Sequence, residues 1–267
     1  MRIGLNVFGV GAAALGMVGL VWGDFATVWQ PVPAELPGYR GLAYAAAVLL
    51  LACGVGLQLK RSASIAACAL AALFLAFAVP WAVRVVRFPQ LFGTWAGCAE
   101  QLALAIAPLS LMAAGKPRQG RLCRIAFGAC AIAFGLNHFF ALPQTAGMVP
   151  SWIPPGQIFW AAATGIFYVS GGVALVTGVL ASLAARLLAL MIACFGVLIW
   201  APALFAHPES HLVWAGNAIN LLATAGAWII ADSISAGKSR DVPAAGGGSD
   251  PLLPARRWRP QRQVTDS

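Results

Sequence analysis

The sequence predicts an all-α membrane protein made of two tandem four-helix transmembrane bundles. Three observations support this prediction. First, 60% of the 267 residues are hydrophobic and only 9% are charged, whereas soluble domains carry about 25% charged residues. Second, eight apolar runs are long enough to cross a bilayer, which takes about 20 residues each. Third, the two halves share sequence landmarks. Helices are expected because lipid offers no partner to an unpaired backbone group.

The eight apolar runs are separated by short connections rich in Pro, Gly or basic residues. The expected spans are 3–22, 40–59, 62–83, 95–115, 124–142, 157–180, 183–206 and 212–231. A cleaved signal peptide is the alternative for the first run, because it follows Met1-Arg2. That run is longer than a typical signal core and lacks a small-x-small cleavage site before Trp22, which favours a span.

A shift of 119 positions aligns Trp, Pro and Gly residues of the two halves. It places Trp81 on Trp200, Pro89 on Pro208, and Trp95-Ala96-Gly97 on Trp214-Ala215-Gly216. We therefore expect a tandem duplication. Its parts are a first four-span unit at 1–115, a cytoplasmic linker at 116–123, a second unit at 124–231 and a disordered basic cytoplasmic tail at 232–267. Because each unit has an even number of spans, the two units are expected to be related by a pseudo-twofold axis along the membrane normal.

The basic residues predict the orientation of the chain in the membrane. Of the 17 Lys and Arg residues, only Arg40, Arg84 and Arg87 fall on one side of an eight-span chain. The positive-inside rule then places both termini in the cytoplasm. The net charge of +9 is thus explained by topology, and the expected partner is the lipid bilayer rather than nucleic acid.

Ionisable side chains within spans are candidates for function, because each costs about 2.5–3.5 kcal/mol near the bilayer centre. Glu100 is the only acidic residue within an expected span, and His138 is the only histidine within one. Glu100 is either a proton or cation site or the partner of Arg84 or Arg87 in an ion pair. His138 either binds a ligand or ties the following loop to a neighbouring helix.

Amides form a second polar group near the same side of the membrane. Asn217 and Asn220 are three residues apart and share a helix face, and their first-half counterparts are Cys98 and Gln101. Such a stripe either lines a cavity or makes hydrogen bonds between helices.

Three motifs in the second half resemble the DoxX family of four-helix bacterial membrane proteins. They are Gly135-x-x-His138-Phe139, Val149-Pro150-x-Trp152-x-Pro154, and Thr164-Gly165 followed by Gly171-Gly172-x-x-Leu175. The resemblance covers about 124–231 and implies a compact bundle in the bacterial inner membrane. Some relatives are subunits of a thiosulfate:quinone oxidoreductase, and others accompany redox or detoxification systems. Family members commonly have Gly-x-x-Glu where this chain has Gly165-x-x-Tyr168, so the acid of any shared proton or quinone chemistry is missing.

We expect a polar pocket that opens outward and binds a small amphipathic molecule, such as a quinone or a lipid, or that supports a partner redox enzyme. The expected lining residues are His138, Glu100, Trp152, Tyr168, Asn217 and Asn220. No cofactor motif is evident and no metal site is expected, so quinone is the remaining cofactor candidate and catalysis by this chain alone is not expected. The alternatives are a small-molecule transporter with its site between the two halves and a quinone-linked oxidoreductase subunit.

Overall fold

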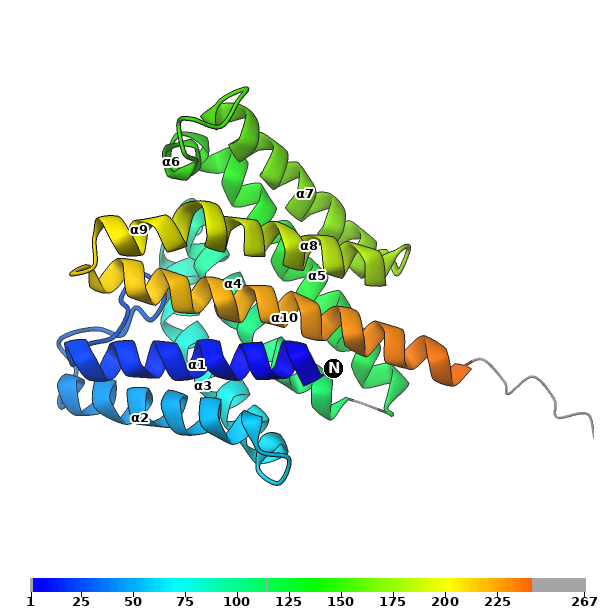
Figure 1. Ribbon diagram of the computed structural model, residues 1–267, viewed down its shortest axis with the longest axis horizontal. Coiled ribbons are helices and arrows are strands. Elements are labelled where there is room, and N and C mark those ends of the chain that lie inside the picture. The colour runs from blue at the N-terminus through cyan, green and yellow to red at the C-terminus, as the bar shows by residue number, and fades with distance from the viewer. Residues whose placement is uncertain (1, 114, 242–267) are drawn as a thin grey trace, which may run out of the picture.

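The computed structural model describes residues 2–113 and 115–241, and within these ranges it contains helices and no strands (Figure 1). The helices of the first half are α1 (Arg2–Trp22), α2 (Tyr39–Gln58), α3 (Ala63–Arg87) and α4 (Phe92–Met112). Those of the second half are α5 (Pro117–Phe140), α6 (Leu142–Met148), α7 (Gln157–Thr177), α8 (Ala181–Phe195), the π-helical turn η1 (Gly196–Trp200), α9 (Ala201–Ala206) and α10 (His211–Asp241).

Eight of the helical segments in the described ranges are long and apolar enough to cross a membrane. Seven are single helices, and the remaining one, Ala181–Ala206, is formed by α8, η1 and α9 in succession. The short helix α6 lies in the connection between α5 and α7. The predicted all-α class with eight candidate spans is therefore confirmed.

Two predicted boundaries differ from the structure, because helix α5 begins earlier and helix α10 ends later than expected. Helix α5 begins at Pro117 and so includes most of the expected linker 116–123. Proline favours this position because its fixed φ suits the first turn and its missing N–H has no helical partner there. Helix α10 continues to Asp241, so the first part of the expected tail is helical, while 242–267 lie outside the described residues.

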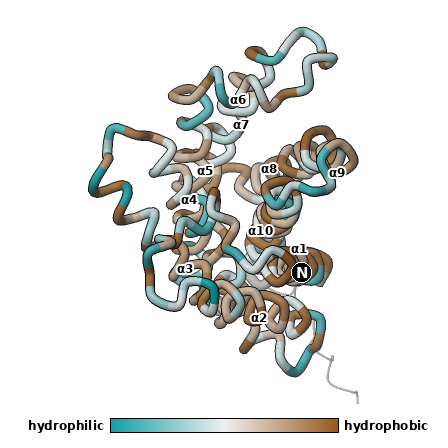
Figure 2. Tube along the Cα trace, turned by 90° about the vertical axis from the view of Figure 1, so that its left-hand side faces the viewer, coloured by the Kyte–Doolittle hydropathy of each residue, from teal (hydrophilic) through white to brown (hydrophobic). Residues whose placement is uncertain are grey.

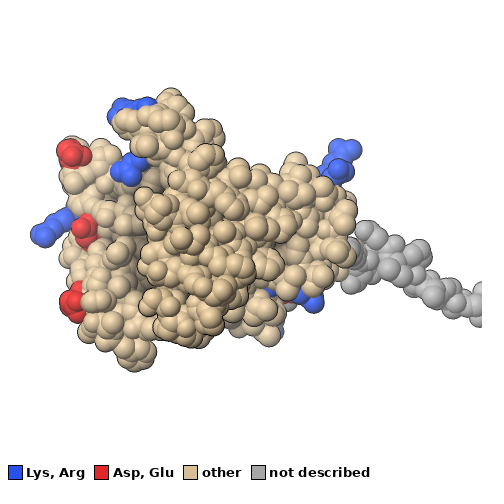
Figure 3. All heavy atoms as spheres, turned by 90° about the horizontal axis from the view of Figure 1, so that it is seen from above, with Lys and Arg blue, Asp and Glu red and all other residues tan. Residues whose placement is uncertain are grey.

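Charged side chains lie at the two ends of the molecule, and a broad uncharged belt separates them (Figure 3). We call the end that carries the connections 23–38, 149–156 and 207–210 the outer end. Figure 2 looks towards this end and shows that its polar segments are mostly connections between apolar helices. This distribution suits a bilayer that surrounds the uncharged belt, because charged groups then stay in water.

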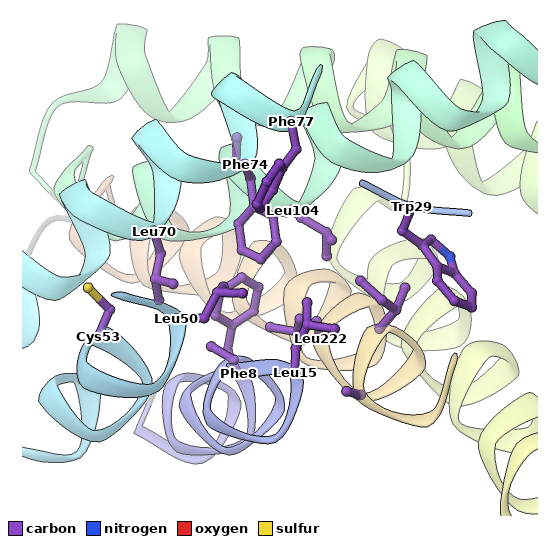
Figure 4. Close-up of a cluster of buried hydrophobic side chains, with 14 of the residues drawn as sticks. Phe8, Leu15, Trp29, Leu50, Cys53, Leu70, Phe74, Phe77, Leu104 and Leu222 are labelled. Carbon is purple, nitrogen blue, oxygen red and sulfur yellow. The ribbon is translucent and has the colours of Figure 1, made fainter. Parts of the chain in front are cut away.

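The helices pack in pairs within each half, and three further contacts join the halves. Helix α1 packs on α2, α3 on α4, α5 on α7, and α8 on α10. Helix α10 also packs on α1 and on α4, and α4 also packs on α5. The larger buried core accordingly combines residues of α1 to α4 with residues of α10; Leu222 of α10, for example, lies beside Leu15 and Phe8 of α1 (Figure 4).

Glycine allows the closest helix contacts in both halves. A Cβ atom on Gly9 of α1 would lie 2.7 Å from the carbonyl oxygen of Gly54 in α2. In the same way, a Cβ atom on Gly128 of α5 would lie 2.8 Å from the carbonyl oxygen of Gly172 in α7. Close approach of this kind is how apolar helices associate in lipid, where burial of apolar surface gives no driving force.

Tryptophan contacts also recur in the two halves. The indole N–H of Trp95 donates to the carbonyl oxygen of Pro89 at 3.1 Å, and that of Trp214 donates to the carbonyl oxygen of Pro208 at 2.8 Å. The two pairs are 119 positions apart. They support the duplication, which stays a prediction together with its pseudo-twofold axis.

Candidate functional site

Two of the sequence-predicted site residues come from different halves and lie within electrostatic range of each other, on the two helices α4 and α7 that pack on α5. Glu100 belongs to α4 and is partly buried, whereas Tyr168 belongs to α7 and is 7% exposed. The Glu100 carboxyl group and the Tyr168 hydroxyl group are close enough to interact electrostatically. Helix α5 brings them together because it packs on both α4 and α7.

His138 lies beside Tyr168 in the last turn of α5 and is buried. The ring centroids of His138 and Tyr168 are 5.3 Å apart, and Phe134 is equally close to Tyr168. The Nδ1 atom of His138 lies 3.0 Å from the carbonyl oxygen of Phe134. Because a carbonyl oxygen only accepts, Nδ1 carries the proton, and Nε2 of the neutral ring is then an acceptor.

Gly165 makes room for this imidazole. A Cβ atom at Gly165 would lie 2.9 Å from Cβ of His138 and 3.1 Å from the ring of Phe139. A larger residue would push α7 away from α5 and separate His138 from Tyr168. The Thr164-Gly165 motif therefore positions the two polar rings.

Buried amides next to these residues lack hydrogen-bond partners. Gln101, which follows Glu100 on α4, is fully buried, and neither polar atom of its side chain has a partner. The Oδ1 atom of Asn137, next to His138, is also buried without a partner. An unsatisfied buried polar group costs about 1–3 kcal/mol, so a bound molecule or water that completes these bonds would stabilise the protein.

Trp29 is a site residue that sequence reasoning missed. The connection between α1 and α2 folds inward, so that Trp29 is 8% exposed and its side chain lies near the Glu100 carboxyl group. The ring of Trp29 lies 5.9 Å from that of Trp200, and its carbonyl oxygen accepts a 3.0 Å hydrogen bond from Trp81. From sequence, a Trp in a Pro-rich connection indicates only an interfacial position.

Asn217 and Asn220 lie on α10 and bind the backbone of the neighbouring span. The side-chain amide of Asn220 donates to the carbonyl oxygen of Ile192 at 3.0 Å, and that of Asn217 donates to the carbonyl oxygen of Trp200 at 2.8 Å. Ile192 lies before the π-helical turn η1, and Trp200 is its last residue. The regular helical bonding pattern changes in this turn. The two amides therefore stabilise the irregular part of this span.

Other predicted contacts are not formed. Trp152 is 70% exposed in the outer connection and contacts none of the predicted pocket residues through a described interaction. Within the described chain no ion pair joins Glu100 to Arg84, whose guanidinium lies over the ring of Trp81 instead, 5.1 Å from its centroid. Of the predicted pocket residues, His138 thus lies beside Tyr168, and Tyr168 lies within electrostatic range of Glu100, whereas the two asparagines bind backbone. The pocket itself stays a prediction.

The histidines near the outer end are also separate from each other. Nδ1 of His207 lies 3.7 Å from the Glu209 carboxylate, and both side chains are exposed. His211 instead stacks on Trp22, with ring centroids 5.1 Å apart. Among the described residues, no three His, Cys, Asp or Glu side chains are grouped so that they could hold a metal ion.

Eight apolar helices and a few polar side chains buried between them define a multi-pass membrane protein. Residues 121–206 match the family model of DoxX, which confirms that this part of the chain is DoxX-like. The match includes His138 and Tyr168, whereas Glu100, Trp29 and α10 lie outside it. Neither a curated protein nor a solved structure matches the chain.

Proposed function

We propose that this DoxX-type membrane protein binds a small amphipathic molecule with a hydroxylated or quinonoid ring between α4, α5 and α7. The observation that carries the proposal is the contact between the buried rings of His138 and Tyr168, with Glu100 of the opposite half within electrostatic range of Tyr168. Neither half contains all three groups, so the proposed site needs both halves of the predicted duplication.

The chemistry of the three groups suits a quinol or quinone headgroup. A quinol hydroxyl donates to Nε2 of neutral His138 or to Glu100, and a quinone carbonyl accepts from the hydroxyl of Tyr168. The aromatic rings of Phe134 and Tyr168 offer stacking surfaces worth about 0.5–1.5 kcal/mol per pair beyond burial. The apolar tail of such a molecule would remain in the surrounding lipid.

The same groups disfavour a phospholipid headgroup as the ligand. Phosphate is usually bound by Arg or Lys, and in the described part of the chain no Arg or Lys pairs with or hydrogen-bonds to Glu100, His138 or Tyr168. A neutral ring with oxygen substituents therefore fits better than a phosphodiester.

The binding test uses protein purified in nanodiscs and titrated with a short-chain quinol or quinone, with quenching of tryptophan fluorescence as the readout. We expect Glu100→Gln, Tyr168→Phe and His138→Ala each to weaken binding by about tenfold, because each removes one partner of a buried hydrogen bond, which costs about 1–3 kcal/mol, and 1.4 kcal/mol is a factor of ten.

Trp152→Phe is the matched control, because it changes an exposed aromatic residue outside the group, and its affinity should equal that of the wild type. Wild-type affinity in all three site variants would contradict the proposal. Native mass spectrometry of the purified protein provides an independent readout, in which a retained quinone should disappear in Tyr168→Phe. The transporter and oxidoreductase-subunit alternatives stay predictions, as does a redox partner enzyme.

A further inference from the structure

A small cavity lies near the outer end between α1, α2 and the connection that joins them. It is lined by apolar residues such as Leu15, Ala47 and Leu50, and on one side by Asp24, Gln30 and His211. Its volume is about 10 Å³, measured as the space open to the centre of a water-sized sphere. That volume is about what a single water molecule needs, since cavities of roughly 10–15 Å³ by this measure are the smallest that hold one.

Two buried nitrogen atoms of residues that line the cavity lack hydrogen-bond partners. Gln30 is 4% exposed, and its Oε1 accepts a 3.0 Å hydrogen bond from the backbone N–H of Ala26, which leaves Nε2 without a partner. Nε2 of His211 is likewise buried without a partner. Buried polar groups in native proteins are nearly always satisfied by protein or ordered water, so both atoms point to a bound molecule.

Asp24 supplies the acceptor of the same group. Its Oδ1 accepts hydrogen bonds from the backbone N–H of Phe25 at 2.7 Å and from the hydroxyl of Tyr39 at 2.5 Å. His211 interacts electrostatically with Asp24. The cavity is thus bordered by a fixed donor (Gln30), a carboxylate and an imidazole that can either donate or accept.

Under the predicted repeat, a residue that lines the cavity corresponds to His138. Gly19 lines it and lies 119 positions before His138. A Cβ atom on Gly19 would lie 2.9 Å from Cβ of Ala47, just as one on Gly165 would lie 2.9 Å from Cβ of His138. Under the predicted repeat, the second half therefore carries an imidazole where the first half carries a glycine beside the cavity.

Two of the contacts between the halves also differ in their stacked rings. At the contact of α4 with α5, Phe92 stacks on Phe140 with ring centroids 4.5 Å apart. At the contact of α1 with α10, the stacked rings belong to Trp22 and His211, and His211 lies 119 positions after Phe92. One junction is apolar, and the other presents polar groups to a cavity.

We propose that the first half holds a binding site for one water molecule, which accepts from Nε2 of Gln30 and bridges to His211 and Asp24. Water fits because it both accepts and donates, whereas the amide N–H of Gln30 would repel a metal cation and the carboxylate would repel an anion. The site ties the α1–α2 connection to α10 and is separate from the Glu100 site.

Hydroxyl-radical labelling by synchrotron radiolysis tests the site in the whole protein, because a bound water generates the radical next to the residues it touches. Phe25 lines the cavity and is 5% exposed, and Phe77 is its matched control because it is 4% exposed, contacts Phe25 and does not line the cavity. We expect oxidation of Phe25 to exceed that of Phe77 severalfold. Equal oxidation of the two rings would overturn the proposal.

His211→Phe is the decisive variant, because it converts the junction to the Phe–Phe type and keeps a ring against Trp22. We expect it to reduce oxidation of Phe25 to the level of Phe77, whereas His207→Phe, an exposed change at the same end, should leave oxidation of Phe25 unchanged. A density map that resolves ordered water should show a peak within hydrogen-bonding distance of Gln30 Nε2. Absence of that peak, or undiminished Phe25 oxidation in His211→Phe, would count against the site.

Discussion

The indole ring of Trp200 covers Gly216 so closely that a Cβ atom at Gly216 would overlap the ring. The same relation joins Trp81 and Gly97, where an added Cβ would lie 2.6 Å from the ring. Each pair holds the last two spans of its half together near the outer end. Because the partner of Gly216 is a rigid ring rather than a flexible chain, the contact leaves no room for adjustment.

Gly216→Ala should therefore destabilise the protein. Overpacking of a close contact costs about 1–3 kcal/mol, and a lower midpoint of thermal unfolding in detergent would report it. Gly93→Ala is the control, because an added Cβ there meets nothing within 4 Å, and helix propensity even favours it slightly. Equal unfolding midpoints for both variants would show that the Trp200 contact is looser than the structure indicates.

Gly172→Ala should separate α5 from α7. An added Cβ would lie 2.6 Å from the carbonyl oxygen of Gly128, a backbone atom that cannot move without its helix. We expect lower thermal stability and, because His138 and Tyr168 lie on these two helices, weaker quinol binding as well. Gly147→Ala in α6, where nothing lies within 4 Å, should change neither quantity.

Asn220→Ala should lower stability modestly. The side chain donates to the carbonyl oxygen of Ile192 at 3.0 Å, and hydrogen bonds between membrane helices contribute about 0.6 kcal/mol on average, with a maximum of about 1.7. Ser170→Ala is the control, because Ser170 is exposed and bonds only within its own helix. A loss of quinol binding with unchanged stability would instead give Asn220 the ligand-binding role that its spacing suggested.

The predicted orientation is tested by reporter fusions. A fusion at Pro150 should report the outer compartment, and fusions at Ser62 and at the carboxyl end should report the cytoplasm, because the basic residues concentrate on that side. Identical signals from Pro150 and the carboxyl end would refute the eight-span topology with both termini in the cytoplasm.

The sequence could predict part of the site because lipid makes polar residues conspicuous. Glu100 and His138 stand out as the acid and the histidine of the apolar runs, and Tyr168 stands out because the resemblance to DoxX implies an acid at its position. Trp152 also stood out, yet its place in a motif with Pro residues says nothing about whether a loop side chain points inward. Trp29 and Gln101 gave no such signal, because burial of one Trp or one amide depends on which helices meet around it.

The sequence by itself determined the helical class, the eight candidate spans and the few polar positions, because a bilayer restricts both the length of a span and the groups it tolerates. Only the tertiary structure decided that Glu100 of the first half lies within electrostatic range of Tyr168 of the second, that the asparagines of α10 bind the backbone around η1, and that His211 faces a cavity. Hydropathy is a property of each segment alone, whereas these contacts depend on how α4, α5 and α10 pack across the two halves. In lipid, that packing is set by small residues and ring contacts whose partners lie far apart in the sequence.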